Sequence, residues 1–209
     1  MTLQHLEKAC EEFISTQPST DSAHGLPHVR RVVKNVRLLL QEEEGSEFIA
    51  VLAAWLHDCV SYPKNHPHRK LASKHAAAQA DAFLATLQVP RAKRSQIAHA
   101  IEAHSFSANI EPKTIDAAIV QDADRMEALG AIGIARCLMV GAELGRPLCH
   151  PTDPFCEHRD ADDSRWTIDH FYAKLFALPD TMRTEAGKRE AEKRVQVMND
   201  FLARLAEEL

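Results

Sequence analysis

The stretch SEFIAVLAAWLHD, residues 46–58, is apolar on nearly all sides and ends in two ionisable side chains, His57 and Asp58. A helix that is apolar all round is normally buried at the centre of a protein. The segment therefore predicts a central helix. Its last two residues place an imidazole and a carboxylate where the pattern requires core.

Helical periodicity continues on both sides of this segment, and no run alternates apolar and polar residues as a β-strand would. Pro27 opens a helix at a position where its missing N–H costs nothing, and regularly spaced valines and leucines give that helix an apolar stripe. The sequence therefore predicts an all-α fold. The other expected helices span residues 2–16, 27–40, 69–87, 91–104, 114–144, 164–178 and 184–208.

A chain of 209 residues is long enough for one sizeable core. We expect a single domain over residues 1–209, with a core of about residues 20–145 and a helical extension over about residues 160–209. The sequence GRPLCHPTDPFCEHRDADDS between them exceeds the usual connection length, which predicts a functional or disordered loop. Within residues 114–144, Gly130 and Gly133 allow a bend or close packing.

The composition, 45% hydrophobic and 26% charged, is typical of a globular protein. No apolar run approaches the roughly 20 residues of a membrane span, and a net charge of −5 without basic clusters argues against nucleic-acid binding. Five cysteines without a C-x-x-C pair indicate reduced thiols, and the N-terminus lacks a signal-peptide pattern. We expect a cytoplasmic protein with no membrane or nucleic-acid partner. Oligomeric state leaves no signal, and a homodimer stays open.

Four ionisable residues fall on segments that otherwise predict buried helix. Burying a carboxylate costs several kcal/mol unless it is paired or bound to a metal. A cation held by two imidazole nitrogens and two carboxylate oxygens would compensate all four and join three helices. The alternative is that the histidines are hydrogen-bonded core residues and the aspartates are helix caps or ion-pair partners. The four residues are His28, His57, Asp58 and Asp124.

The order and context of these residues resemble the HD-domain superfamily of metal-dependent phosphohydrolases. The family pattern is a histidine, a His-Asp pair and a later aspartate, and the flanking sequences HVRRV, AWLHD and DADRMEALGAIGIAR resemble it too. HSFS at 104–107 and DHFYAKL at 169–175 are similar to the YedJ-like bacterial subgroup, so the resemblance covers most of the chain. It implies an HD-type helical bundle. The implied metal ligands are His28, His57, Asp58 and Asp124.

The segment DADRM contains two aspartates, of which only one can be the family ligand. In the family pattern the ligand directly precedes a lysine or arginine, which selects Asp124 before Arg125. Asp122 is then expected to orient a ligand histidine. Exchange of these two roles is the main alternative.

The mixed nitrogen and oxygen ligand set suits one divalent transition metal, with manganese as first choice and cobalt, nickel, iron or zinc as alternatives. Magnesium fits less well because it prefers oxygen ligands. An octahedral ion would keep two positions for a water and a phosphate oxygen. The implied function is hydrolysis of a phosphate ester or anhydride of a small soluble substrate such as a nucleotide. The alternatives are a metal-dependent binding or regulatory module with little turnover, and a two-iron oxygenase.

Charge on the phosphate oxygens calls for cations beside the metal. Lys64 is the first candidate, although it could be a solvated loop residue, and His24 could act as general acid or only cap a helix. The expected substrate contacts are Lys64, Arg69, His104 and Arg125. The expected catalytic residues are Asp58, Lys64 and His24.

Other histidines and cysteines leave two further possibilities. A second metal would need ligands from His75, His99 or His104, but the pattern of two-metal relatives is not cleanly present. A zinc site could be formed by Cys149, His150, Cys156 and His158, although their spacing matches no common structural pattern. Lys174 and Arg194 fall in segments that resemble the family tail, where they could reach the site or form salt bridges.

Overall fold

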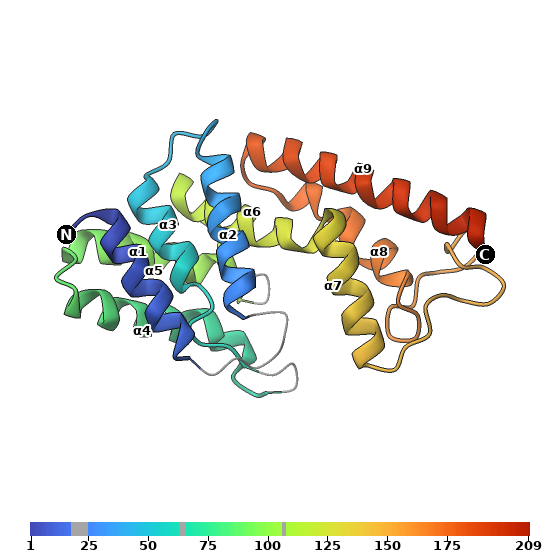
Figure 1. Ribbon diagram of the computed structural model, residues 1–209, viewed down its shortest axis with the longest axis horizontal. Coiled ribbons are helices and arrows are strands. Elements are labelled where there is room, and N and C mark those ends of the chain that lie inside the picture. The colour runs from blue at the N-terminus through green and yellow to red at the C-terminus, as the bar shows by residue number, and fades with distance from the viewer. Residues whose placement is uncertain (18–24, 63–65, 106–107) are drawn as a thin grey trace. The chain divides into compact units, whose positions relative to one another are not determined.

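The computed structural model describes residues 1–17, 25–62, 66–105 and 108–209 (Figure 1). Within these ranges the regular structure is helical and no strand occurs, which confirms the all-α prediction. No helix in the described ranges is both long and apolar enough to cross a membrane. The contacts divide the chain into two compact units, Met1–Asp124 and Arg125–Leu209. The expected core, about residues 20–145, extends across this boundary, and the single-domain organisation stays a prediction.

The first unit is built around helix α3 (Glu47–Leu56), in which every residue from Ile49 onward is buried. Helices α1, α2 and α5 all pack against α3. The prediction of a central helix is therefore confirmed. The other helical elements are α1 (Leu3–Ser15), α2 (Leu26–Leu39), the 3₁₀ turn η1 (Arg69–Leu71), α4 (Ala72–Thr86), α5 (Arg91–His104) and α6 (Ile115–Arg125).

Both ends of α3 are defined by side chains. The hydroxyl of Ser46 caps the first turn by accepting from the Ile49 N–H at 3.4 Å, and Asp116 of α6 accepts from the Ser46 N–H at 2.6 Å. At the other end the helix stops at Leu56, with His57 as its C-cap. Because the helix ends there, Asp58 leaves the helical path.

Two buried amide side chains fix helix α6 in the first unit. Asn35 of α2 donates to the Ala123 carbonyl at 3.0 Å, and Gln121 of α6 donates to the Ala103 carbonyl of α5 at 2.6 Å. A buried amide is stable only when such hydrogen bonds are made. These bonds therefore hold α6 in register with α2 and α5 just before Asp124.

The second unit has its own apolar core. Its helical elements are η3 (Met126–Ala128), α7 (Gly130–Glu143), α8 (Asp169–Ala173), η4 (Leu175–Ala177), η5 (Pro179–Thr181) and α9 (Glu185–Glu208). Its core residues are Leu129, Ile134, Ile168, Phe171, Leu175, Ala191, Met198 and Leu202. The prediction of a long helix over residues 164–178 is wrong, because Lys174 leaves helical geometry at φ −143° and only short turns follow.

The predicted helical stretch 114–144 is interrupted at Gly130, which adopts a left-handed φ of +67°. A Cβ at this position would lie 3.3 Å from the Arg194 side chain, whose guanidinium donates to the Met126 carbonyl at 2.8 Å. Gly133 packs so closely on the Ala128 backbone that a Cβ would overlap it. The expectation of a bend and close packing at the two glycines is confirmed.

The connection between α7 and α8 is held by its own polar side chains. Asp153 accepts from the backbone N–H groups of Glu157 and His158, both at 2.9 Å. Arg159 makes a two-pronged ion pair with the fully buried Asp169, at 2.5 and 2.8 Å. These contacts give the predicted loop a defined course without regular secondary structure.

Replacing Gly130 with alanine is expected to lower the free energy of unfolding by about 2 kcal/mol, because a left-handed φ costs an L-residue about 1–2 kcal/mol and the new Cβ crowds Arg194. Gly145 is the matched control, since its φ is +65° but its Cβ would meet nothing within 4 Å. Gly145→Ala should therefore lose about 1 kcal/mol. Urea denaturation followed by circular dichroism measures both variants. Equal losses would show that the Arg194 contact adds nothing.

Candidate metal centre

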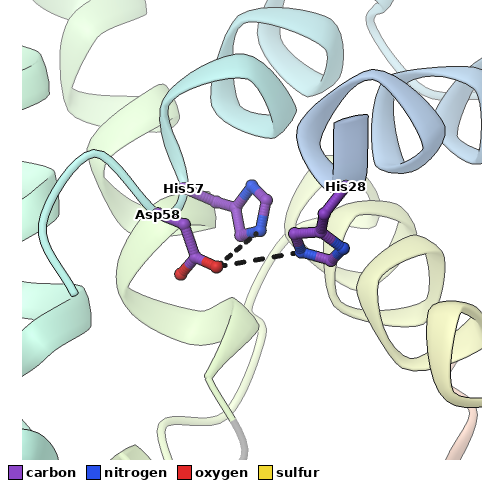
Figure 2. Close-up of side chains that lie close together, drawn as sticks. All are labelled: His28, His57 and Asp58. Atoms are coloured by element: carbon purple, nitrogen blue, oxygen red, sulfur yellow. Dashed lines mark ion pairs between the residues drawn. The ribbon is translucent and has the colours of Figure 1, made fainter. Parts of the chain in front are cut away.

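Side chains from three helices meet in the first unit. His28 comes from α2, His57 and Asp58 from the end of α3, and Asp124 from α6. The ligand atoms of His28, His57 and Asp58 all lie within 4.8 Å of one another. Figure 2 shows both imidazoles turned toward one oxygen of the Asp58 carboxylate. Asp124 faces the same two rings, so the structure brings together all four predicted ligands.

The spacing between these atoms suits an ion better than direct hydrogen bonds. Asp58 Oδ2 lies 3.4 Å from His57 Nε2 and 3.8 Å from His28 Nε2. Asp124 Oδ1 lies 3.4 Å from His28 Nε2 and 3.8 Å from His57 Nε2. An N–H···O bond spans about 2.7–3.2 Å. Two ligands about 2.1 Å from one ion lie about 3.0 Å apart at right angles and about 4.2 Å apart when opposite, so the observed distances fit a divalent ion.

The orientation of His57 is fixed by the end of its own helix. Its Nδ1 lies 2.8 Å from the Ala54 carbonyl, and because a carbonyl only accepts, Nδ1 carries the hydrogen. In the neutral form of His57, Nε2 therefore presents its lone pair to the cluster. This nitrogen is buried, and no hydrogen bond from the described part of the chain reaches it. A bound cation would supply the missing partner.

The charges in the cluster are strongly coupled. Burial disfavours the charged form of His57, but the carboxylates of Asp58 and Asp124 outweigh it and raise its pKa to about 9. Burial also disfavours the Asp58 carboxylate, yet His57 and His104 hold its pKa well below the usual range. The pKa of Asp124 is lowered against burial by His28 and His57. A proton on His57 balances the metal-free cluster, and a divalent ion would replace that proton.

A third imidazole, His104, joins the cluster from the end of α5. Its Nε2 lies 3.6 Å from Asp58 Oδ1, the oxygen that does not face the other two histidines. Its Nδ1 lies 2.6 Å from the Ile101 carbonyl, the same bond to the residue three positions earlier that His57 makes. The side chain is buried beside Asp58. Its role as a substrate contact stays a prediction.

The other candidates for a second metal lie apart from this cluster. His75 Nδ1 bonds the Tyr62 hydroxyl at 2.9 Å, and His99 Nε2 accepts from the Lys113 N–H at 2.9 Å. The described residues therefore give no support to a two-iron centre built from these histidines.

The possible zinc site in the long connection is not assembled either. Among the described residues, one group of three or more side chains has metal-ligand spacing, and it is the His28, His57 and Asp58 group. His150 instead accepts from the backbone N–H of Asp153 at 3.2 Å. The zinc alternative at Cys149, His150, Cys156 and His158 is thus not supported.

The remaining predicted residues have varied positions. Asp122 is fully buried on α6, two positions before Asp124. Arg69 donates to the Tyr62 carbonyl at 3.1 Å, and Arg125 donates to the Thr181 carbonyl within the second unit. These three roles stay predictions. The two residues outside the described ranges are His24 and Lys64. Lys174 forms an ion pair with Asp163, and Arg194 forms one with Glu190.

Two residues that position the cluster were not found from the sequence. Asn35 lies seven residues after His28 and therefore on the same face of α2, and Gln121 lies three residues before Asp124 on α6. A signal was present, because each is an uncharged amide inside an apolar helical pattern. A buried amide marks a specific hydrogen bond, here to the carbonyls at 123 and 103.

Comparison with known proteins agrees with this geometry. The HD domain family model matches residues 25–129. The chain belongs to the HD domain family. This HD protein is 28% identical over 194 residues to the uncharacterized protein YpgQ of Bacillus subtilis, which covers 90% of the chain and 85% of YpgQ. The superfamily prediction is confirmed, and the finer YedJ-like assignment stays a prediction.

Solved structures extend the similarity to the whole chain. An HD-superfamily hydrolase from Bacillus thuringiensis is 32% identical with a TM-score of 0.77, covering 99% of this chain and 98% of that one. The structure of Bacillus subtilis YpgQ in complex with ADP is 25% identical with a TM-score of 0.75, covering 100% and 97%. Both units of the HD protein are therefore shared with these relatives.

The two aspartates of DADRM are expected to differ in metal affinity. Asp124→Ala should lose metal more severely than Asp122→Ala, because Asp124 faces both imidazoles, whereas loss of a residue that only orients a ligand costs about 10–100-fold in affinity. Metal content by elemental analysis and titration with Mn²⁺ measure the order. The reverse order would exchange the two roles.

Metal binding is expected to release about one proton at pH 7.5, because the pKa of His57 is raised to about 9 without metal. The release should decline as the pH rises through 9. In the metal-free protein, the protonated His57 stabilises the fold. This contribution is fully present below about pH 6.5 and is lost as the pH rises toward 9. Calorimetric titration with Mn²⁺ in two buffers of different ionisation enthalpy counts the protons. Identical heats in both buffers at pH 7.5 would contradict the expectation.

Proposed function

We propose that this HD protein is a metal-dependent phosphohydrolase that cleaves a phosphate ester or anhydride of a small soluble substrate. The observation that carries the proposal is the cluster of two buried imidazoles and two half-buried carboxylates, in which each imidazole Nε2 lies 3.4 or 3.8 Å from an oxygen of each carboxylate. Family membership supports it, since the Bacillus thuringiensis relative is described as an HD-superfamily hydrolase.

The proposed metal ligands present nitrogen and oxygen atoms, a set that suits manganese first and cobalt, nickel, iron or zinc as alternatives. The ion, when bound, would polarise the phosphate and lower the pKa of a bound water. The chain fixes the tautomer of one ligand before the metal binds, because Nδ1 of His57 donates to the Ala54 carbonyl. The proposed ligands are His28, His57, Asp58 and Asp124.

In the proposed reaction the water oxygen bonds to phosphorus while the P–O bond to the leaving group breaks. Asp58 is assigned to accept the proton of the water and His24 to protonate the leaving oxygen. His104 faces the outer oxygen of Asp58 at 3.6 Å, a position from which it would contact the phosphate. The further proposed substrate contacts are Lys64, Arg69 and Arg125.

A nucleotide is the proposed substrate class. The support is the ADP bound to YpgQ, a relative that matches the whole length of this chain. Phosphate groups would meet the metal cluster, whereas the organic part of the substrate needs a separate surface. The identity of that organic part decides the specificity of the enzyme.

The proposal is tested by assaying phosphate and pyrophosphate release from nucleoside mono-, di- and triphosphates and sugar phosphates with Mn²⁺, Co²⁺, Ni²⁺ and Mg²⁺. We expect metal-dependent turnover that Asp58→Ala lowers by at least about 10²-fold, because it removes both a proposed ligand and a proton acceptor. Asp200→Ala, which changes an exposed carboxylate on α9, should keep full activity.

Two results would contradict the proposal. The absence of turnover with every metal, together with equal metal content in the wild type and Asp58→Ala, would remove it. Tight metal and nucleotide binding without turnover would favour the alternative of a ligand-binding or regulatory module.

A further inference from the structure

The segment that follows the metal cluster is strongly basic. Between Asp58 and Asp81 the sequence contains four lysines or arginines and three histidines, and no aspartate or glutamate. The whole chain, in contrast, has a net charge of −5. A local excess of positive charge in an acidic protein suits a polyanionic ligand such as a di- or triphosphate.

Four aromatic rings cluster in this segment: three of them lie between α3 and α4, and the fourth, His75, lies on α4. Tyr62 contacts all three of the others: His66 stacks on it with centroids 4.5 Å apart and planes 7° apart, His75 meets it edge-on at 5.9 Å, and His68 lies at 6.4 Å. His66 and His68 are 5.4 Å apart. Tyr62 is therefore the centre of the ring cluster, defined as Tyr62, His66, His68 and His75.

Hydrogen bonds fix these rings although they lie at the surface. The Tyr62 hydroxyl bonds His75 Nδ1 at 2.9 Å, and the N–H of His68 donates to His66 Nδ1 at 3.1 Å. Arg69 donates to the Tyr62 carbonyl at 3.1 Å. Tyr62 and His66 are half-buried, and His68 and His75 are exposed. The ring cluster is thus a preformed aromatic surface that solvent can reach.

The spacing of the rings argues for stacking and against metal binding. In the described part of the chain, groups with metal-ligand spacing include no member of the ring cluster. A planar base, in contrast, binds by stacking on tyrosine and histidine rings and needs no convergent lone pairs. The planar and basic character of the segment together fit a nucleotide.

The ring cluster also lies within reach of the metal cluster. Tyr62 is four residues after Asp58, so their Cα atoms are at most about 15 Å apart at about 3.8 Å per residue. That limit allows one nucleotide to place its phosphates at the metal cluster and its base at the rings.

We infer that the ring cluster is the stacking surface for the base of the substrate nucleotide. The inference rests on the proposed function and adds the residues that select the organic part of the substrate. Purines should bind more tightly than pyrimidines, because their larger π surface stacks more strongly. The discrimination should depend on the Tyr62 ring and be independent of its hydroxyl.

The test compares two non-hydrolysable ligands of the Mn²⁺-loaded protein by calorimetry: α,β-methylene-ADP, and methylenediphosphonate, which has the phosphonate pair without a nucleoside. Tyr62→Leu should lower the affinity for α,β-methylene-ADP by about 5- to 150-fold, which is the range for loss of one base–aromatic stack. Binding of methylenediphosphonate should stay unchanged. Tyr62→Phe keeps the ring and should retain affinity for both ligands. His158→Ala, an exposed histidine outside the ring cluster, is the matched control.

The outcomes separate this inference from the proposed function. The inference would be overturned if Tyr62→Leu kept its affinity for α,β-methylene-ADP, or if its affinity for both ligands fell equally. Metal-dependent binding of methylenediphosphonate would in that case still support the phosphohydrolase. Binding of neither ligand to the wild type would count against both. If Tyr62→Leu fails to fold or to hold metal, two other measurements decide: the affinity of His66→Ala for α,β-methylene-ADP, and the ratio of wild-type affinities for purine and pyrimidine nucleotides. Unchanged affinity in His66→Ala together with no purine preference would overturn the inference.

Discussion

Two buried imidazoles and two half-buried carboxylates meet where α2, α3 and α6 come together, and the architecture of the first unit depends on keeping their charges compensated. Burial alone costs each charge several kcal/mol. The cost is offset only when the four groups stay close enough to share a proton or an ion. Asn35 and Gln121 therefore matter to the site without touching a ligand, because their hydrogen bonds fix the helix that carries Asp124.

The two histidines nearest Asp58 are presented by the same local device. Each lies at the C-terminal end of a helix and donates from Nδ1 to the carbonyl three residues earlier, His57 to Ala54 and His104 to Ile101. Carbonyls at a helix C-terminus lack intrahelical partners and carry partial negative charge. One bond thus satisfies an otherwise unpaired carbonyl and aims Nε2 beyond the helix. Sites built on helix ends in this way are held more rigidly than sites on loops.

The sequence was sufficient to predict the central helix and the four residues of the cluster, because ionisable side chains in an apolar helical pattern are a local and costly signal. It was insufficient for the second unit. The glycines predicted the bend at Gly130, but not that a side chain there would crowd Arg194. The early end of α8 follows the non-helical backbone at Lys174, which periodicity does not encode. Asn35 was missed because one amide on a helix does not reveal whether it faces a distant carbonyl.

The position of Asp124 along the chain has a consequence for biosynthesis. It is the last residue of the first unit, whereas His28 lies on the second helix of that unit. During synthesis the chain leaves the ribosome N-terminus first, and domains generally fold as units in that order. The nascent chain therefore exposes both imidazoles and Asp58 well before the fourth side chain exists, and the cluster closes only when the unit is complete. A chain that terminates early would retain a partial, weakly chelating site, so capture of the ion would mark the end of first-unit assembly.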